Sequence, residues 1–185
     1  TNANGADATG FRVYSSGTQL PSGAYESYSL YFYAQGSGVT GSNVDIRTRA
    51  SVGLTSAWQH VMCKVDTNQA VATDRIKLYI DGVLQTNLYV PSGTPSYPDK
   101  DAVFYLGDND YVTQIGKVPY NASAYNDIYV AEHAFITGTN AVSKTVSDFG
   151  AVDTATNKWV PKDISGFTFG HNGHYLEFKT TPGSG

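Results

Sequence analysis

The stretch Ile76-Lys77-Leu78-Tyr79-Ile80-Asp81-Gly82-Val83 decides the fold class of this chain. Its apolar and polar residues alternate from Ile76 to Ile80, the pattern of a strand with one face in a core. Asp81-Gly82 then separates this run from a second strand-like run. This dipeptide favours a two-residue hairpin, because glycine accepts a positive φ. The stretch therefore predicts two antiparallel strands joined by a tight turn.

The same period of two recurs along the chain. Val61, Cys63 and Val65, for example, alternate with Met62 and Lys64. Ten such runs are expected, near residues 10–14, 28–34, 43–50, 58–65, 75–81, 83–90, 103–107, 126–136, 167–169 and 174–179. The best helical candidate is short, at Val142–Phe149, and is closed by Gly150. Many short strands separated by turns predict an all-β fold, an antiparallel two-sheet sandwich with at most one short helix.

The chain has 185 residues, a length that suits one compact domain. No internal repeat or long linker divides it, and the Gly- and Ser-rich stretch 36–42 is interpreted as a hairpin loop. The polar ends, residues 1–9 and 180–185, are expected to be tails outside the core. We therefore expect a single β-sandwich domain over residues 1–185.

Composition disfavours several classes of protein. Sixteen Asp and Glu against twelve Lys and Arg give a net charge of −4, which argues against a nucleic-acid partner. Apolar runs such as Leu30–Ala34 are far shorter than the roughly twenty residues of a membrane-spanning helix. The single cysteine, Cys63, excludes an internal disulfide and is expected to be a core residue, and no signal peptide is visible at Thr1.

The motifs of common enzymes are incomplete. Residues 36–41 match G-x-G-x-x-G, but a strand rather than a helix is expected to follow, so nucleotide binding is disfavoured. Glu26, Glu132 and Glu177 each lack a carboxylate two residues away, which disfavours the glucanase-type motif. Distant carboxylates can still converge in a fold, so a glucanase stays the third and least favoured hypothesis.

Two aspartates are the candidate metal ligands. Asp108-Asn109-Asp110 resembles the start of a calcium loop, although the residues at the later EF-hand positions do not fit. An irregular calcium site that includes Asp108 and Asp110 therefore stays open. His171 and His174 have a metal-like spacing around a glycine turn, and we interpret them as turn or interface residues rather than zinc ligands.

Tyrosine is the strongest compositional signal, with fourteen copies. Tyr31, Tyr33 and Tyr105 alternate with the apolar residues of their own runs and are expected to point outward. An outward tyrosine suits sugar stacking or a protein interface, and the alternative is that it packs in a second layer. The candidate ligand-binding residues are Tyr31, Tyr33, Tyr105, Tyr111, Tyr120 and Tyr125.

Several segments resemble a known family in their order along the chain. They are Ser56–Val61, Val65-Asp66, Asp74–Gly82, Tyr105–Gly107, Asp127–Ile136, Ser147–Gly150, Trp159–Lys162 and Gly170–Phe178. Together they resemble a laminin-G-like, concanavalin-A-like jelly-roll domain, in the version found in virion proteins of tailed, especially marine, bacteriophages. The resemblance covers roughly residues 10–178. It implies packing roles for Trp58 and Trp159 and turn roles for Gly82, Gly107 and Gly173.

The chain departs from the family at two places. Family members begin with further strands and a Trp-rich segment, which are absent here or replaced by Thr1–Thr9. We expect a neighbouring subunit, or the rest of a longer chain, to supply such a strand. His174 also stands where the family has a tyrosine or phenylalanine near the last strand.

The resemblance implies a binding or structural role without catalysis. The leading hypothesis is a non-enzymatic virion module, such as a fibre, an appendage or a capsid decoration. It would assemble with copies of itself or other virion proteins through Tyr-rich surfaces, with host-surface glycan as a candidate ligand. The alternative is a secreted or surface lectin-like module, with calcium as a candidate cofactor. Neither hypothesis includes a nucleic-acid partner or a membrane span.

Overall fold

The computed structural model describes residues 8–14, 29–35, 39–41, 43–52, 58–90, 94–106, 115 and 129–179. Within these residues the chain is mostly antiparallel β-strand with few helices, as predicted. No helix in the described part is long and apolar enough to cross a membrane.

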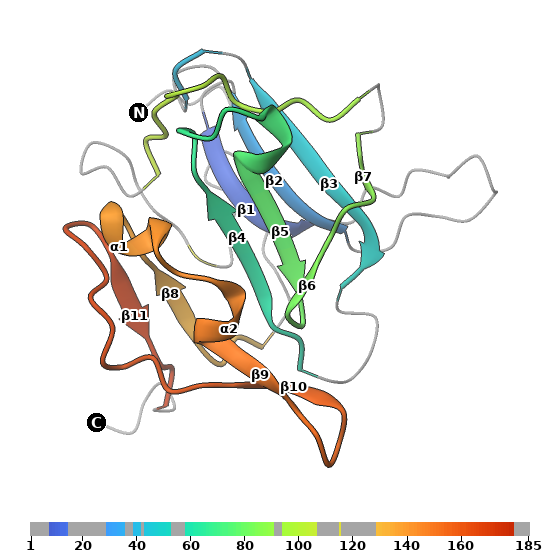
Figure 1. The fold of residues 1–185 in the computed structure, drawn as a ribbon, viewed down its shortest axis with the longest axis vertical. Helices are drawn as coiled ribbons and strands as arrows, with labels where there is room; N and C mark the ends of the chain where they lie inside the picture. Colours follow the sequence, from blue (N-terminus) through green and yellow to red (C-terminus); the bar gives the residue numbers. More distant parts are fainter. Residues whose placement is uncertain are drawn as a thin grey trace.

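The largest sheet has four strands in the order β1-β2-β3-β7 (Figure 1). These are β1 (Ala8–Tyr14), β2 (Ser29–Gln35), β3 (Val44–Ser51) and β7 (Leu88–Tyr89). The pairing of β2 with β3 is irregular near Leu30, where the Thr48 hydroxyl accepts the Leu30 N–H at 3.0 Å. Because Thr48 is fully buried, this bond satisfies a polar group inside the core.

A second sheet has the order β4-β5-β6. It contains β4 (Val61–Val65), β5 (Ile76–Ile80) and β6 (Val83–Leu84), and the 3-10 turn η2 (Ala72–Asp74) precedes β5. β5 alternates buried and half-buried residues as its sequence predicts. Ile80 pairs with Val83, so Asp81 and Gly82 form a two-residue turn, with φ values of 47° and 78°. The predicted hairpin is therefore confirmed.

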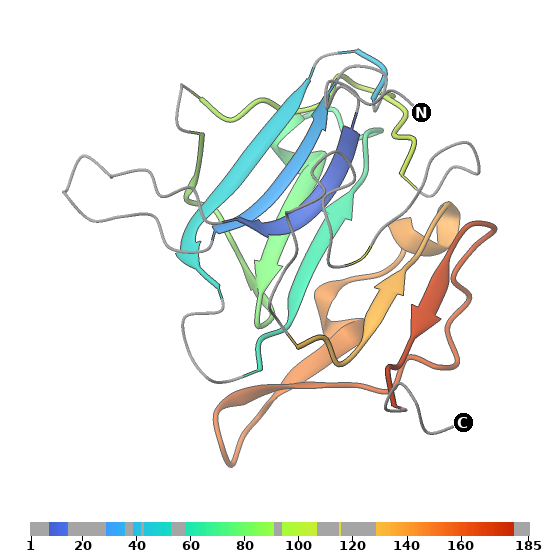
Figure 2. The ribbon, with the colours of Figure 1, turned by 180° about the vertical axis from the view of Figure 1, so that it is seen from behind.

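The two sheets lie against one another with the core between them. Seen from behind in Figure 2, β1–β3 lie in front of β4 and β5, and Figure 1 shows the reverse order. The buried cluster joins Leu30, Phe32 and Ile46 of the first sheet to Ile76 and Leu78 of the second. Cys63 packs against this cluster, as predicted, and burial raises the pKa of its thiol. The core therefore consists of the inner faces that the alternation predicts.

One expected strand, residues 83–90, is divided between the two sheets. Its first part, β6, pairs with β5, and its last part, β7, pairs with β3. The chain crosses between them at residues 85–87, where the backbone N–H of Gln85 donates to the Leu78 carbonyl and the backbone N–H of Arg49 donates to the Asn87 carbonyl. The prediction of one strand over residues 83–90 is therefore wrong. The apolar pattern does not distinguish one long strand from two short ones.

The C-terminal part adds two small two-stranded sheets beside β4 (Figure 1). One pairs β8 (His133–Phe135) with β11 (His174–Leu176). The other pairs β9 (Gly150–Asp153) with β10 (Lys158–Pro161), a hairpin that the sequence did not predict. The strands predicted near residues 103–107 and 167–169 are not found in the described residues 103–106 and 167–169. Phe104 makes only a single bridge with Val39.

The helix expected at Val142–Phe149 is instead two separate turns, so the expectation of at most one short helix is wrong. They are α1 (Thr139–Val142) and α2 (Val146–Phe149). Thr145 interrupts them: its backbone N–H and its hydroxyl both donate to the Asp148 carboxylate, at 2.7 and 2.9 Å. Lys64 of β4 donates to the Val142 and Lys144 carbonyls, both at 2.8 Å, and so attaches the C-terminal part to the second sheet.

Candidate functional site

Tyr31 and Tyr33 lie on the outer side of β2, opposite Leu30 and Phe32, as the alternation predicts. They are nevertheless only 4% and 7% exposed. Of the two alternatives for these outward tyrosines, a binding surface or a packed second layer, the structure shows the second. The alternation of side chains along a strand decides the side of the sheet on which a residue lies, but it does not decide whether that side is covered.

The outer side of the first sheet is a packed layer of rings and charges. The Arg47 guanidinium lies 4.3 Å from the centre of the Tyr31 ring, and the Tyr31 and Tyr33 rings are 5.2 Å apart. The Arg47 Nε lies 3.6 Å from Asp45 Oδ1. The ring face and the carboxylate offset part of the cost of burying the guanidinium charge. This side of the sheet is covered and is not an open binding surface.

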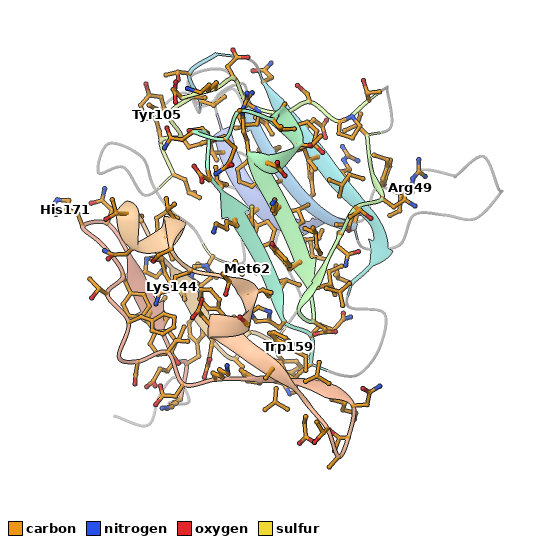
Figure 3. All side chains as sticks on the ribbon, in the orientation of Figure 1. Arg49, Met62, Tyr105, Lys144, Trp159 and His171 are labelled. Carbon is orange, nitrogen blue, oxygen red and sulfur yellow. The ribbon has the colours of Figure 1, made fainter. Side chains whose placement is uncertain are left out.

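The other predicted tyrosines are placed only in part. Tyr105 is half-buried, near the Val39 to Phe104 bridge (labelled in Figure 3). Tyr111, Tyr120 and Tyr125 lie outside the described residues. Tyr129, which is not among the candidate ligand-binding residues, is 92% exposed. The proposed Tyr-rich surface is thus not available at Tyr31 and Tyr33.

The candidate calcium ligands Asp108 and Asp110 also lie outside the described residues, as does Gly107. In the part of the chain that the structure describes, no three His, Cys, Asp or Glu side chains are grouped so as to hold a metal ion. The calcium expectation therefore stays a prediction.

A packed aromatic cluster forms at the Asp81-Gly82 turn. The Trp159 ring lies over Gly82 and over Gly150, and His60 tilts against the same ring at a centroid distance of 5.6 Å. The backbone N–H of His60 donates to the Asp81 carboxylate at 2.8 Å. Trp159 thereby joins the β9–β10 hairpin to the β5–β6 turn, in agreement with its expected packing role.

Trp58 does not have its expected packing role. Its side chain is 69% exposed. Gly173, an expected turn residue, follows the turn at residues 171–172 and donates its N–H to the Gly170 carbonyl at 3.3 Å. A side chain at Gly173 would overlap the Phe169 carbonyl, so close backbone approach requires glycine there.

Two histidines that are distant in sequence form a pair between β8 and β11. His174 Nε2 and His133 Nδ1 are 3.1 Å apart, and the two rings stack at a centroid distance of 5.1 Å. Burial, with the charge of His174, lowers the pKa of His133. The spacing in sequence predicts that His174 lies at a turn near His171, whereas the structure pairs it with His133. Nothing in the sequence indicates the His133–His174 pair, because it depends on the register of two short strands.

Acid is expected to weaken the fold through the buried histidines. Burial lowers the pKa of both His60 and His133 below the ordinary 6.5, so the unfolded chain binds more protons below that pH. The free energy of unfolding should decrease as the pH falls from 6.5 toward the lowered values and should be unaffected by these groups above 6.5. Urea unfolding at about pH 7.5 and about pH 5 measures this decrease.

The matched variant is His133→Asn, which removes one of the two groups. We expect a smaller loss of stability between the two pH values than in the parent chain. An identical loss in both proteins would show that His133 does not contribute to the pH dependence.

A polar hollow lies on the side of β8 and β11 opposite the histidine pair. It measures about 370 Å³ and is lined by Glu132, Asp163, Tyr175, Glu177 and Lys179, among others. Two of the three glutamates of the chain thus converge here, together with a tyrosine. From the sequence, a meeting of distant glutamates was a possibility without a specific signal. Glu132 and Glu177 come together because β8 pairs with β11.

Hydrogen bonds already organise this hollow. Lys179 Nζ lies 2.6 Å from Glu177 Oε1, and Asp163 accepts the Ser165 N–H at 2.9 Å. Burial and the hydrogen-bonded carboxylate of Glu132 raise the pKa of Tyr175, whose ring stacks on Phe169 at 5.7 Å. The hollow thus brings carboxylates, an ammonium and a phenol together.

A search of protein-family models, of curated proteins and of solved structures finds no match to this chain.

Proposed function

We propose that this chain is a non-enzymatic structural module of a phage virion, with the concanavalin-A-like jelly-roll fold that its sequence resembles. It acts as a fibre, appendage or capsid-decorating unit at the virion surface and assembles with copies of itself. The resemblance supports the virion context. The single observation that carries the assembly role is a group of exposed apolar side chains around Trp159.

The Trp159 patch, as it is called here, consists of three exposed side chains, Trp58, Val83 and Val152, and the half-buried ring of Trp159. Trp58, Val83 and Val152 are 69%, 64% and 51% exposed. Val83 follows the glycine that Trp159 covers, Val152 pairs with Trp159 across the β9–β10 hairpin, and Trp58 precedes His60 by two residues. Figure 3 labels Trp159 where β10 meets the end of the second sheet.

Grouped exposed apolar side chains are typical of protein interaction surfaces, whereas single ones are ordinary. Trp is also enriched among the residues that contribute most of the energy of an interface. The Trp159 patch therefore replaces the Tyr31 and Tyr33 side of the first sheet as the contact surface of the proposed assembly.

Light scattering coupled to size exclusion tests the assembly. We expect a defined oligomer for the parent chain and a smaller species for the double variant Trp58→Ser, Val152→Lys. Val71→Lys is the matched control, because Val71 is 58% exposed but lies beside η2, at the other end of β5. Thermal unfolding of all three proteins checks that they are folded.

A monomer at every accessible concentration would overturn self-assembly, and an oligomer that the double variant leaves intact would overturn the Trp159 patch as its contact surface. Mass spectrometry of purified particles tests the virion context separately. Absence of the chain from particles would reject it and leave the alternative, a secreted or surface lectin-like module. The polar hollow is the observation that favours this alternative.

A further inference from the structure

We propose that His133 and His174 form a two-histidine site for a divalent transition-metal ion, on the side of β8 and β11 opposite the polar hollow. The two nitrogens that face one another, Nδ1 of His133 and Nε2 of His174, each donate a lone pair to the ion. The inference goes beyond the proposed function and is independent of it, since neither histidine belongs to the Trp159 patch.

The spacing of the two nitrogens suits a chelated metal ion. They are 3.1 Å apart. Imidazole nitrogens lie about 2.0–2.1 Å from zinc, so two of them on one ion are separated by about 2.9 Å in a square-planar arrangement and about 3.3 Å in a tetrahedral one. The observed separation falls between these values. One ion can therefore reach both nitrogens once the rings tilt so that their lone pairs converge on it.

The pair holds a proton between the two nitrogens that the ion would join. Two lone pairs at this distance would repel one another, so one nitrogen donates an N–H···N hydrogen bond to the other. A neutral imidazole carries a single N–H, and that proton can lie on either ring nitrogen. When the ion binds, the donor's proton moves to the other nitrogen of the same ring. Both facing nitrogens then have a lone pair, and no proton is lost overall.

The strand pairing brings the two rings together before an ion binds. β8 and β11 are joined through three residue pairs, in which Leu176 lies opposite His133 and Phe135 lies opposite His174. The Phe135 ring also lies against the His174 ring, at a centroid distance of 5.8 Å. Groups that are held in place in this way lose little conformational entropy on binding.

The groups around the pair favour a transition metal over calcium or magnesium. Imidazole suits Zn²⁺, Cu²⁺ and Ni²⁺, whereas Ca²⁺ and Mg²⁺ take oxygen ligands. Glu132 and Glu177 line the hollow on the other side of the strands, and no third His, Cys, Asp or Glu within the described part of the chain joins the pair. Both histidines are only half-buried, so water can occupy the remaining coordination positions.

Two protein ligands predict a modest affinity. A site with half of the ligands of a four-ligand zinc site has roughly half of its binding free energy, which corresponds to a Kd of about 1–200 µM for Zn²⁺. The affinity should also follow the general order of the divalent metals, so we expect Cu²⁺ to bind more tightly than Zn²⁺.

Isothermal titration calorimetry of the full chain tests the site, with Zn²⁺ and Cu²⁺ as the probes and Mg²⁺ as the negative probe. Nuclear magnetic resonance of the imidazole nitrogens during a Zn²⁺ titration identifies the ligand atoms. We expect the resonances of His133 Nδ1 and His174 Nε2 to shift as their lone pairs bind. We expect no comparable shift for His171, which is exposed (Figure 3).

Two variants remove a ligand but keep a hydrogen bond between the two positions. His174→Gln places an amide N–H near the position of Nε2, and His133→Asn places an amide oxygen near the position of Nδ1. We expect each variant to weaken the Zn²⁺ affinity at least about tenfold, because even the loss of an outer-shell partner costs about 10–100-fold. His171→Asn is the matched control and should leave the affinity unchanged.

Three results would overturn the inference: neither Zn²⁺ nor Cu²⁺ binds, an ion binds but both ligand variants leave its affinity unchanged, or His171→Asn weakens binding as much as they do. The last two would show an adventitious ion only. Light scattering on the same samples separates this inference from the proposed function. An oligomer that binds no metal ion would reject only the site, and a monomer whose Zn²⁺ affinity depends on His133 and His174 would reject only the assembly.

Discussion

Replacing Gly82 by valine is expected to lower the free energy of unfolding by about 3–5 kcal/mol. Gly82 has a φ of 78°, which a β-branched residue resists. A Cβ at this position would also overlap Cζ3 of Trp159 and lie 2.5 Å from its Cε3. The backbone and the ring over it both require glycine, so the two costs add. Urea unfolding of the parent and the variant measures the difference.

A double-mutant cycle with Trp159→Ala separates the two costs. In that background the ring is absent, so Gly82→Val should cost less than in the parent chain, by about 1–3 kcal/mol. Gly166→Val is the control, because Gly166 has open space around its Cβ position and no positive φ, and we expect a change within about 0.5 kcal/mol. Equal costs with and without Trp159 would show that the ring does not lie on the turn.

Phe32→Ala has the second large expected effect, a loss of about 3–5 kcal/mol of unfolding free energy. Phe32 is 2% exposed and belongs to the cluster between the two sheets. Its ring meets Phe104 edge to face at a centroid distance of 5.6 Å. Truncation leaves a cavity that the surrounding strands cannot fill. The shift in urea midpoint at an unchanged slope measures the loss.

A total stability of about 5–15 kcal/mol means that Phe32→Ala can unfold the chain altogether. Phe32→Leu then gives a measurable intermediate, with a loss smaller than that of alanine. Tyr129→Ala is the exposed control and should change stability by less than about 0.5 kcal/mol. A similar effect at positions 32 and 129 would contradict a core between the two sheets.

Features that depend on neighbouring residues can be predicted from the sequence, whereas features that depend on distant residues cannot. The strand at 75–81 is present at Ile76–Ile80, and its Asp-Gly turn has the expected positive φ values. Both depend on neighbouring residues alone. The β9–β10 hairpin was missed because Gly150–Asp153 has a single large apolar residue, Val152, and no alternation. Its position depends on Trp159, which packs on a turn from another part of the chain.

The candidate sites were predictable to a smaller extent. The alternation placed Tyr31 and Tyr33 on the correct side of β2, but the exposure of that side depends on everything that packs over it. The spacing of the glutamates along the sequence indicates no carboxylate pair, whereas Glu132 and Glu177 meet through the pairing of β8 with β11. A spacing rule cannot identify such a site, because the contact crosses between strands.

The sequence by itself determined the all-β class, the inner faces of β2, β4 and β5, and the tight turn at Asp81-Gly82. These features follow from side-chain periodicity and from the φ preference of glycine, which act over a few residues. Only the tertiary structure decided that Tyr31 is covered, that His133 pairs with His174, that Trp159 lies on Gly82 and that two glutamates share a hollow. Each of these contacts depends on the packing of the whole chain, since the free energy of a distant contact includes the cost of ordering everything between its partners.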